Sequence, residues 1–197
     1  MKNVLLTTDF SENAENAINY AINMFGIEDV QYVVLNSYQD ISASSGSLVS
    51  LIDTLRNDSI DRLKSHVEDL LAANKGIVVE SKSIYGSVTQ GIKTLSEETA
   101  FDYLIIGTKG ISVLENLIVG SNTMDVIKSI KIPTLVIPTK FEHHKIHNIA
   151  FAADYEKLKD SHILEPMIEV AKLAGAEVKI VNVSEKEEAV DVPHALE

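Results

Sequence analysis

Three glycines with a defined spacing are the residues of this sequence best suited to holding a ligand. Gly107 and Gly110 are separated by two residues, and Gly120 follows after nine more. Glycine lets the backbone approach a ligand closely and adopt a positive φ without steric cost. Gly120 precedes Ser121 and Thr123, whose hydroxyl groups can hold phosphate oxygens together with the free N–H groups of a helix start. The pattern predicts a phosphate-binding loop.

Two charged residues add to this candidate site. Asp9 follows an apolar run, and its carboxylate is suited to accept hydrogen bonds from ribose hydroxyls or an adenine amino group. Lys109 lies inside the loop and could supply a positive charge, although a solvated side chain is the commoner role. Each of these residues also has a purely structural interpretation. Asp9 can be a helix-entry residue, the glycines can form turns, and Ser121 can be a helix cap.

Stronger chemical motifs are absent from the sequence. It contains neither G-x-x-x-x-G-K-[ST] nor G-x-G-x-x-G, so neither a P-loop enzyme nor an ordinary dinucleotide-binding domain is expected. No Ser-His-Asp set is legible, so a fast enzyme is not expected either. His143, His144 and His147 lie close together in the chain, but a polar linker is a commoner explanation than a metal site, which needs convergent, supported ligands.

Apolar runs and helical patterns alternate along residues 1–139 and predict the elements that position these residues. Strands are expected at 3–9, 32–36, 77–85, 103–106 and 134–137, with helices between them. This alternation predicts an α/β fold, a doubly wound parallel sheet with helices on both faces. If the strand order is 3-2-1-4-5, it reverses between strands one and four, so Asp9 and Gly107 flank one crevice.

The remaining chain, residues 140–197, looks like a partial second repeat. Residues 147–155 echo residues 2–10, and residues 178–182 echo residues 32–36, with a helical pattern between them. A strand, a helix and a strand are therefore expected, with chance similarity as the alternative. This part has no glycine motif, so one nucleotide per chain is expected. Whether the short repeat is natural or truncated stays open.

Charge and composition narrow the range of partners. The net charge of −12 repels phosphate backbones and anionic membranes, so no nucleic-acid or membrane partner is expected. No run approaches the roughly 20 apolar residues that span a bilayer, the N-terminus lacks a signal-peptide pattern, and cysteine is absent. A cytoplasmic location is therefore expected.

Taken together, these motifs resemble the universal stress protein family. The family's nucleotide motif, G-x2-G-x9-G-[ST], is matched by Gly107, Gly110, Gly120 and Ser121. Residues 5–11 resemble the end of its first strand, and residues 133–138 resemble its closing strand. The resemblance covers residues 1–139 and resumes over residues 147–184.

The resemblance implies a Rossmann-like five-stranded sheet of order 3-2-1-4-5, related to the adenine nucleotide α-hydrolases, and a bound ATP, with or without Mg2+. Asp9 would face the adenine and ribose, and Ser37 would lie against the adenine. Thr7 stands where the family usually has proline. The implied nucleotide-binding residues are Thr7, Asp9, Ser37, Gly107, Thr108, Lys109, Gly110, Gly120, Ser121, Asn122 and Thr123.

The leading hypothesis is an ATP-binding stress-response or regulatory protein that acts by binding rather than by fast catalysis. Two alternatives stay open: an interaction module of the same fold without a nucleotide, and a slow ATP hydrolase. A homodimer is also expected, through the open edge of the fifth strand or through exchanged C-terminal segments. The sequence does not identify the physiological signal, the protein partner, or the choice among ATP, ADP and AMP.

Overall fold

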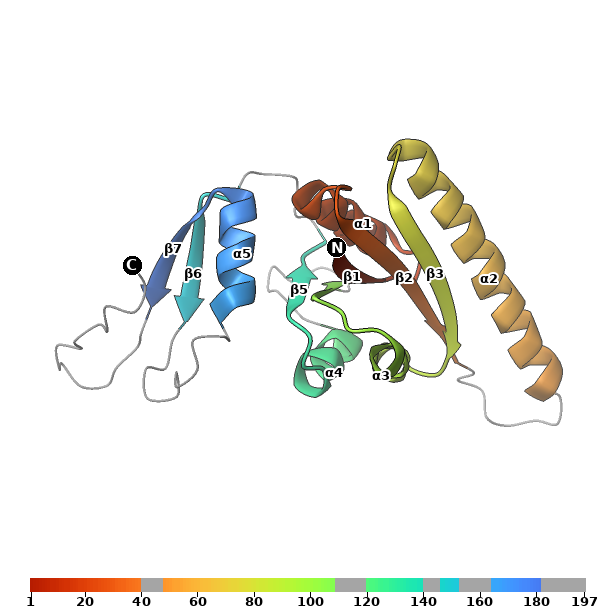
Figure 1. The fold of residues 1–197 in the computed structure, drawn as a ribbon. Coiled ribbons are helices and arrows are strands. Elements are labelled where there is room, and N and C mark those ends of the chain that lie inside the picture. The colour runs from red at the N-terminus through yellow and green to blue at the C-terminus, as the bar shows by residue number, and fades with distance from the viewer. Residues whose placement is uncertain (40–47, 109–119, 140–145, 153–163, 182–197) are drawn as a thin grey trace. The chain divides into compact units, whose positions relative to one another are not determined.

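The computed structural model describes residues 1–39, 48–108, 120–139, 146–152 and 164–181. The chain divides into two compact units, Met1–His144 and Lys145–Glu197, which are described separately. In the first unit, strands and helices alternate along the chain (Figure 1). Its elements are β1 (Lys2–Thr7), α1 (Glu12–Phe25), β2 (Val30–Tyr38), α2 (Leu48–Ala73), β3 (Val78–Tyr85), α3 (Val88–Glu98), β4 (Tyr103–Gly107), α4 (Ser121–Ser129) and β5 (Thr134–Ile137).

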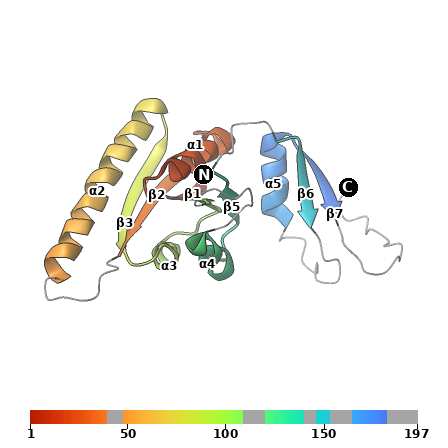
Figure 2. The same ribbon diagram turned by 180° about the vertical axis from the view of Figure 1, so that it is seen from behind.

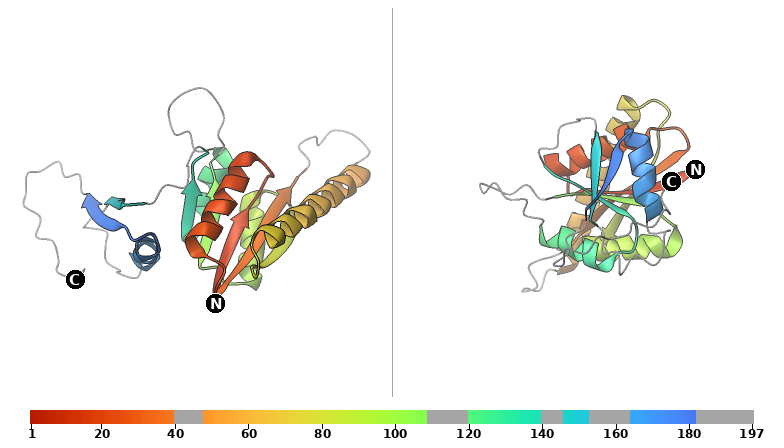
Figure 3. Two further views of the ribbon diagram at one scale, coloured as in Figure 1. Left: turned by 90° about the horizontal axis from the view of Figure 1, so that it is seen from above. Right: turned by 90° about the vertical axis from the view of Figure 1, so that its left-hand side faces the viewer.

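The five strands of the first unit form one parallel sheet of order β3-β2-β1-β4-β5. The predicted doubly wound α/β fold and its strand order are therefore confirmed. Central strand β1 pairs on both sides, so that Leu6 lies opposite Val34 of β2 and Ile105 of β4. Helices α1 and α2 cover one face, and α3 and α4 cover the other (Figure 3). The order reverses between β1 and β4, which places a topological switch point there.

The central strands are apolar because both of their faces are covered. Leu5, Leu35 and Leu104 are fully buried, and they join Ile92 of α3 and Val126 of α4 in one core cluster. Burying each such side chain contributes about 1.5–3 kcal/mol before the entropy cost of ordering it. This packing holds the carboxyl ends of the strands in fixed positions.

The helices begin in different ways. Ser11 caps α1 by accepting a hydrogen bond from the Ala14 backbone N–H at 3.3 Å. Ser87 and Gln90 form a capping box at the start of α3, a pattern that is legible in the sequence. Helix α4 has Gly120 at its N-cap and no side-chain cap. Among the described residues, therefore, no N-cap side chain bonds the first N–H groups of α4, unlike those of α1 and α3.

Helix α2 has a buried seam that is partly polar. The described residues of α2 that are at most 9% exposed are Ser59, Leu63, His66 and Leu70. Two of these four residues are polar, whereas Leu51 and Leu71 of the same helix are exposed.

The second unit contains β6 (Asn148–Ala152), α5 (Glu165–Ala174) and β7 (Glu177–Val181) (Figure 2). The two strands pair in parallel, with Asn148 opposite Glu177. Helix α5 ends at Gly175, whose φ of 64° is left-handed, a conformation that favours glycine. In the described parts of both units, no helix is long and apolar enough to cross a membrane. The cytoplasmic location stays a prediction.

Candidate functional site

A cavity of about 280 Å3 lies at the switch point, beyond the carboxyl ends of β1 and β4. Five segments of the first unit line it: the β1–α1 turn, the end of β2, the β3–α3 turn, the end of β4 and the start of α4. Ligands of open parallel sheets bind at such a crevice. The lining residues are Thr7, Thr8, Asp9, Ser11, Asn13, Ala14, Ser37, Gln39, Gly86, Ser87, Val88, Ile106, Gly107, Gly120, Ser121, Asn122 and Thr123.

Most of the sequence-predicted site residues meet in this cavity. Those that line it are Thr7, Asp9, Ser37, Gly107, Gly120, Ser121, Asn122 and Thr123. Thr108 is buried and is not among the lining residues, and its backbone N–H donates to the Ile137 carbonyl at 2.9 Å. Lys109 and Gly110 lie outside the described residues, as do His143 and His144.

The β1–α1 turn presents Asp9 at the cavity. Asp9 Oδ1 accepts a hydrogen bond from the Ser11 backbone N–H at 3.0 Å, and Thr8 Oγ1 accepts one from the Phe10 N–H at 2.9 Å. Phe10 has a left-handed φ of 60°, which is unfavourable for a residue with a Cβ atom. One oxygen of Asp9 therefore serves the helix entry, and the exposed carboxylate remains part of the cavity wall.

Thr7 links the two strands that border the switch point. Its hydroxyl donates to the Ile105 carbonyl of β4 at 3.2 Å, and the side chain is buried. A proline at this position could not make this side-chain bond. The departure from the family pattern thus has a structural role of its own, because it ties β1 to β4 next to the cavity.

Of the two helix N-termini at the cavity, that of α4 accommodates an anion better than that of α1. Ser121, Asn122 and Thr123 line the cavity, and the first turn contains no acidic residue. Thr123 Oγ1 donates to the Gly107 carbonyl at 3.3 Å, which fixes the helix start against β4. The first turn of α1, by contrast, already carries Glu12 and an additional acidic residue. Electrostatics therefore direct a phosphate to α4 rather than α1.

Gly107 is needed for a reason that the spacing did not reveal. A Cβ atom at this position would lie 2.5 Å from Asn13 Nδ2 and 3.0 Å from the Asn13 carbonyl oxygen. Gly107 does not have a positive φ, and Gly120 has a φ of −61°. Close packing of α1 against β4, rather than backbone strain, explains the glycine at 107.

Asn13 is a cavity residue that sequence reasoning missed. It is 9% exposed, and its side-chain amide donates to the Thr108 carbonyl. Its Oδ1 atom is buried and has no hydrogen-bond partner in the described structure. The available signal was its position four residues before Ala17, on the apolar face of α1. A polar residue on such a face is held there by a partner or faces a ligand.

Ser37 is the second lining residue with an unsatisfied polar atom. Its buried Oγ has no partner in the described structure, and a Cβ atom at Gly91 would come within 2.7 Å of it. Ser37 ends β2 next to the β3–α3 turn, where Gly86 and Ser87 also line the cavity. Among the described residues, no group of three His, Asp or Glu side chains could hold a metal ion.

The sequence and the structure were compared with known proteins. Residues 1–138 match the model of the Universal stress protein family. A protein of Staphylococcus haemolyticus named as a universal stress protein is 29% identical over 143 residues, which cover 71% of this chain and 86% of that protein.

Solved structures of similar proteins share the fold. A universal stress protein from Archaeoglobus fulgidus matches with a TM-score of 0.68 and 23% identity, over 93% of this chain and 67% of that chain. A universal stress protein in complex with cAMP matches with a TM-score of 0.53 and 19% identity, over 70% and 97%. A family protein from Arabidopsis thaliana with AMP bound matches with a TM-score of 0.52 and 14% identity, over 70% and 92%.

Proposed function

Because this chain belongs to the universal stress protein family, we propose that it is a stress-response protein that binds an adenine nucleotide, ATP, in the cavity between β1 and β4. The observation that carries the proposal is the start of α4, which has no side-chain cap and no acidic residue in its first turn and lines the cavity. Such a helix start attracts phosphate through its free N–H groups and its dipole.

The lining residues divide into three groups in this proposal. The backbone N–H groups and hydroxyls of Gly120, Ser121, Asn122 and Thr123 hold the phosphates. Asp9 accepts from the ribose hydroxyls or the adenine amino group, and Ser37 lies against the base near the β3–α3 turn. Gly107 forms the remaining wall, and the sequence motif alone assigns Thr108, Lys109 and Gly110 to the nucleotide. Among the described residues, Asn13 Oδ1 and Ser37 Oγ are buried without hydrogen-bond partners, and a ligand with hydrogen-bond donors would satisfy them.

Mg2+ enters this proposal only as a companion of the phosphates. Mg2+ is commonly held by one or two carboxylates together with substrate phosphates and water. Asp9 is the carboxylate among the described residues that line the cavity. Two proteins of this fold have been solved with cAMP and with AMP bound, which supports the choice of base.

A thermal-shift experiment tests the proposal. At an ATP concentration of about 100 times Kd, binding stabilises the folded chain by about 2.7 kcal/mol, which corresponds to a Tm increase of about 5–10 °C for a chain of this size. Gly120→Val should abolish the increase and Ser121→Ala should reduce it. Ser96→Ala is the control, because Ser96 Oγ donates to the Ile92 carbonyl within α3 and Ser96 does not line the cavity. An unchanged Tm of the wild-type chain at millimolar ATP would contradict the proposal.

One alternative is favoured by specific contacts. Asp9 has a bond within its own turn, and Gly107 is required by packing against α1, so both residues also suit an interaction module without a nucleotide. Analysis of the ligand released on denaturation separates the two, because only a nucleotide-binding protein releases one. Slow ATP hydrolysis stays a prediction, and it should be lost in Asp9→Ala.

We also propose that residues 140–197 are a partial second repeat and that the chain forms a homodimer. Among the described residues, strand β5 is an edge of the five-stranded sheet, and β6 and β7 form a sheet of two strands whose outer edges are open. Open edges pair readily with other chains. The second unit has no glycine motif, so the proposed stoichiometry is one nucleotide per chain.

A further inference from the structure

The buried seam of α2 contains polar residues whose partners lead to the cavity. Ser59 and His66 occupy seam positions and are 3% and 9% exposed. Burying a hydroxyl or an imidazole without a hydrogen bond costs about 1–3 kcal/mol. His66 Nδ1 lies 3.0 Å from Glu15 Oε1 of α1, so this side chain has a partner at the helix that follows the Asp9 turn. The hydrogen bonds of Ser59 lead through Asn36 to Thr8 in the turn that bears Asp9.

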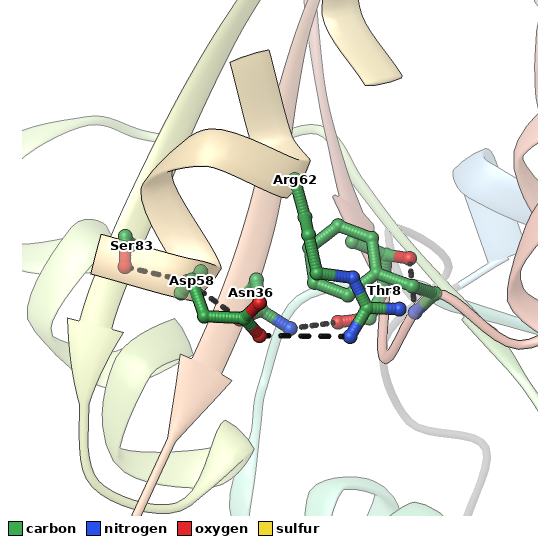
Figure 4. Close-up of polar contacts among 7 residues, drawn as sticks. Thr8, Asn36, Asp58, Arg62 and Ser83 are labelled. Atoms are coloured by element: carbon green, nitrogen blue, oxygen red, sulfur yellow. Dashed lines mark hydrogen bonds and ion pairs between the residues drawn. The ribbon is translucent and has the colours of Figure 1, made fainter. Parts of the chain in front are cut away.

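A chain of hydrogen bonds runs from α2 across β2 to the turn after β1 (Figure 4). Ser59 Oγ lies 2.7 Å from Asn36 Oδ1 and 2.6 Å from Ser83 Oγ. Asn36 Nδ2 donates to the Thr8 carbonyl oxygen at 2.8 Å. Thr8, Asn36 and Ser59 are all buried, so these bonds are shielded from competition with water.

The chemistry of the groups gives this chain of bonds a direction. The Asn36 carboxamide donates through its nitrogen and accepts through its oxygen. Its oxygen accepts the single hydroxyl proton of Ser59. Ser83 must then donate to Ser59, so the order of donation is Ser83, Ser59, Asn36 and the Thr8 carbonyl. Ser59 thus fixes the orientation of Asn36, and Asn36 fixes Thr8.

Helix α2 also contacts the turn from its outer side. The Arg62 guanidinium lies 4.1 Å from the centre of the Phe10 ring, and Asp58 lies 3.8 Å from Arg62. Asn36 therefore contacts Thr8 and Arg62 contacts Phe10, and these are the two residues on either side of Asp9 in the chain. The left-handed φ of Phe10 is a conformation that persists only when its surroundings enforce it.

We propose that Asn36 is a positioning residue for nucleotide binding: it fixes the turn that bears Asp9, and Ser59 of α2 fixes Asn36. This inference rests on the proposed function, since it concerns the same cavity. Neither Asn36 nor Ser59 lines the cavity, and the Thr8 carbonyl is the group of the turn that their hydrogen bonds reach. A loss of these bonds should loosen the turn, so that Asp9 is no longer held in place. ATP binding should then weaken by more than the loss of folding stability alone would cause.

The test compares Asn36→Leu and Ser59→Ala with a matched control in the same strand. Tyr32→Phe also removes one hydrogen bond of a buried β2 side chain, since Tyr32 Oη donates to the Gly26 carbonyl at 2.6 Å. Two quantities are measured: amide hydrogen exchange of Phe10 and Ser11 without nucleotide, and the Kd for ATP by calorimetry. Both amides are hydrogen-bonded inside the turn.

The expected result is graded. Asn36→Leu should raise the ATP Kd by about tenfold, the equivalent of one buried hydrogen bond, and should speed exchange at Phe10 and Ser11. Ser59→Ala should move both quantities in the same direction by a smaller factor. Tyr32→Phe should change neither, although it also lowers the Tm.

Three results would overturn the proposal. The first is that the amides of Phe10 and Ser11 exchange no faster in Asn36→Leu and Ser59→Ala than in Tyr32→Phe. The others are faster exchange with an unchanged Kd for ATP, and an equal change of that Kd in all three variants. If Asn36→Leu does not fold, Ser59→Ala decides by the same criteria. If the wild-type chain binds no ATP, the proposed function fails, and the exchange measurement by itself supports or overturns the positioning of the turn.

Discussion

At Gly107, the packing of α1 against β4 leaves no room for a side chain. The nearest atoms to an added Cβ would belong to the side chain and the backbone of Asn13, and backbone atoms cannot move aside cheaply. Thr123, whose hydroxyl bonds the Gly107 carbonyl, holds the start of α4 to the same point. A single residue thus brings both helix starts to the cavity.

Gly107→Ala should therefore destabilise the chain even without nucleotide. Overpacking of this kind costs about 1–3 kcal/mol, measured by urea denaturation. Asn13→Ala in the same background should restore part of the loss, because it removes the side-chain contact and leaves the contact with the Asn13 carbonyl. A Gly107→Ala chain whose free energy of unfolding lies within about 0.5 kcal/mol of wild type would contradict the close packing of Asn13 against Gly107.

At the scale of elements, the two helix starts at the cavity differ in charge. The first turn of α1 carries acidic residues and that of α4 carries none. A carboxylate in the first turn stabilises a helix by about 0.3–1 kcal/mol. The absence of one from α4 therefore forgoes stability, which is explained if the position is reserved for an anionic ligand.

Ser121→Glu should separate stability from binding. The added carboxylate should stabilise the chain without nucleotide by about 0.3–1 kcal/mol, and it should abolish ATP binding by occupying and repelling the phosphate position. Ser121→Gln, of the same length but neutral, should bind ATP more tightly than Ser121→Glu. Equal ATP affinity in the two variants would argue against phosphate at this helix start.

The sequence predicted elements better than contacts. Alternating apolar runs, the Ser87–Gln90 capping box and the spacing of Gly107 and Gly120 are local signals, and the sheet order and a shared cavity followed from them. The polar seam of α2 did not, because a buried Ser59 has the same appearance in sequence as an exposed one. Asn13 lies on the apolar face of α1, which is a local signal, but its role depends on contacts with Gly107 and Thr108, which lie far along the chain.

At the scale of the whole molecule, the open sheet edges are the features that favour association with another chain. β5 has β4 on one side only, and the β6–β7 pair has a partner on neither outer side within the described residues. Two strands and one helix bury too little surface to be stable on their own. The second unit is therefore expected to be stabilised by association.

Light scattering after size exclusion should give about twice the 21.6 kDa chain mass at micromolar concentration. Edge pairing buries backbone hydrogen-bonding groups and apolar side chains, and so it should persist at moderate salt. The protein would then be measured over a concentration series that starts at micromolar and spans a factor of about 100. A mass equal to one chain at every concentration would contradict the homodimer.

Mass analysis of the intact protein under native conditions tests nucleotide binding most directly. With ATP added, or as purified, each chain should carry one added mass equal to that of an adenine nucleotide, and the Gly120→Val chain should carry none. A wild-type chain that stays free of nucleotide at millimolar ATP would contradict binding in this cavity. Two nucleotides per chain would contradict the assignment of a single site to the first unit.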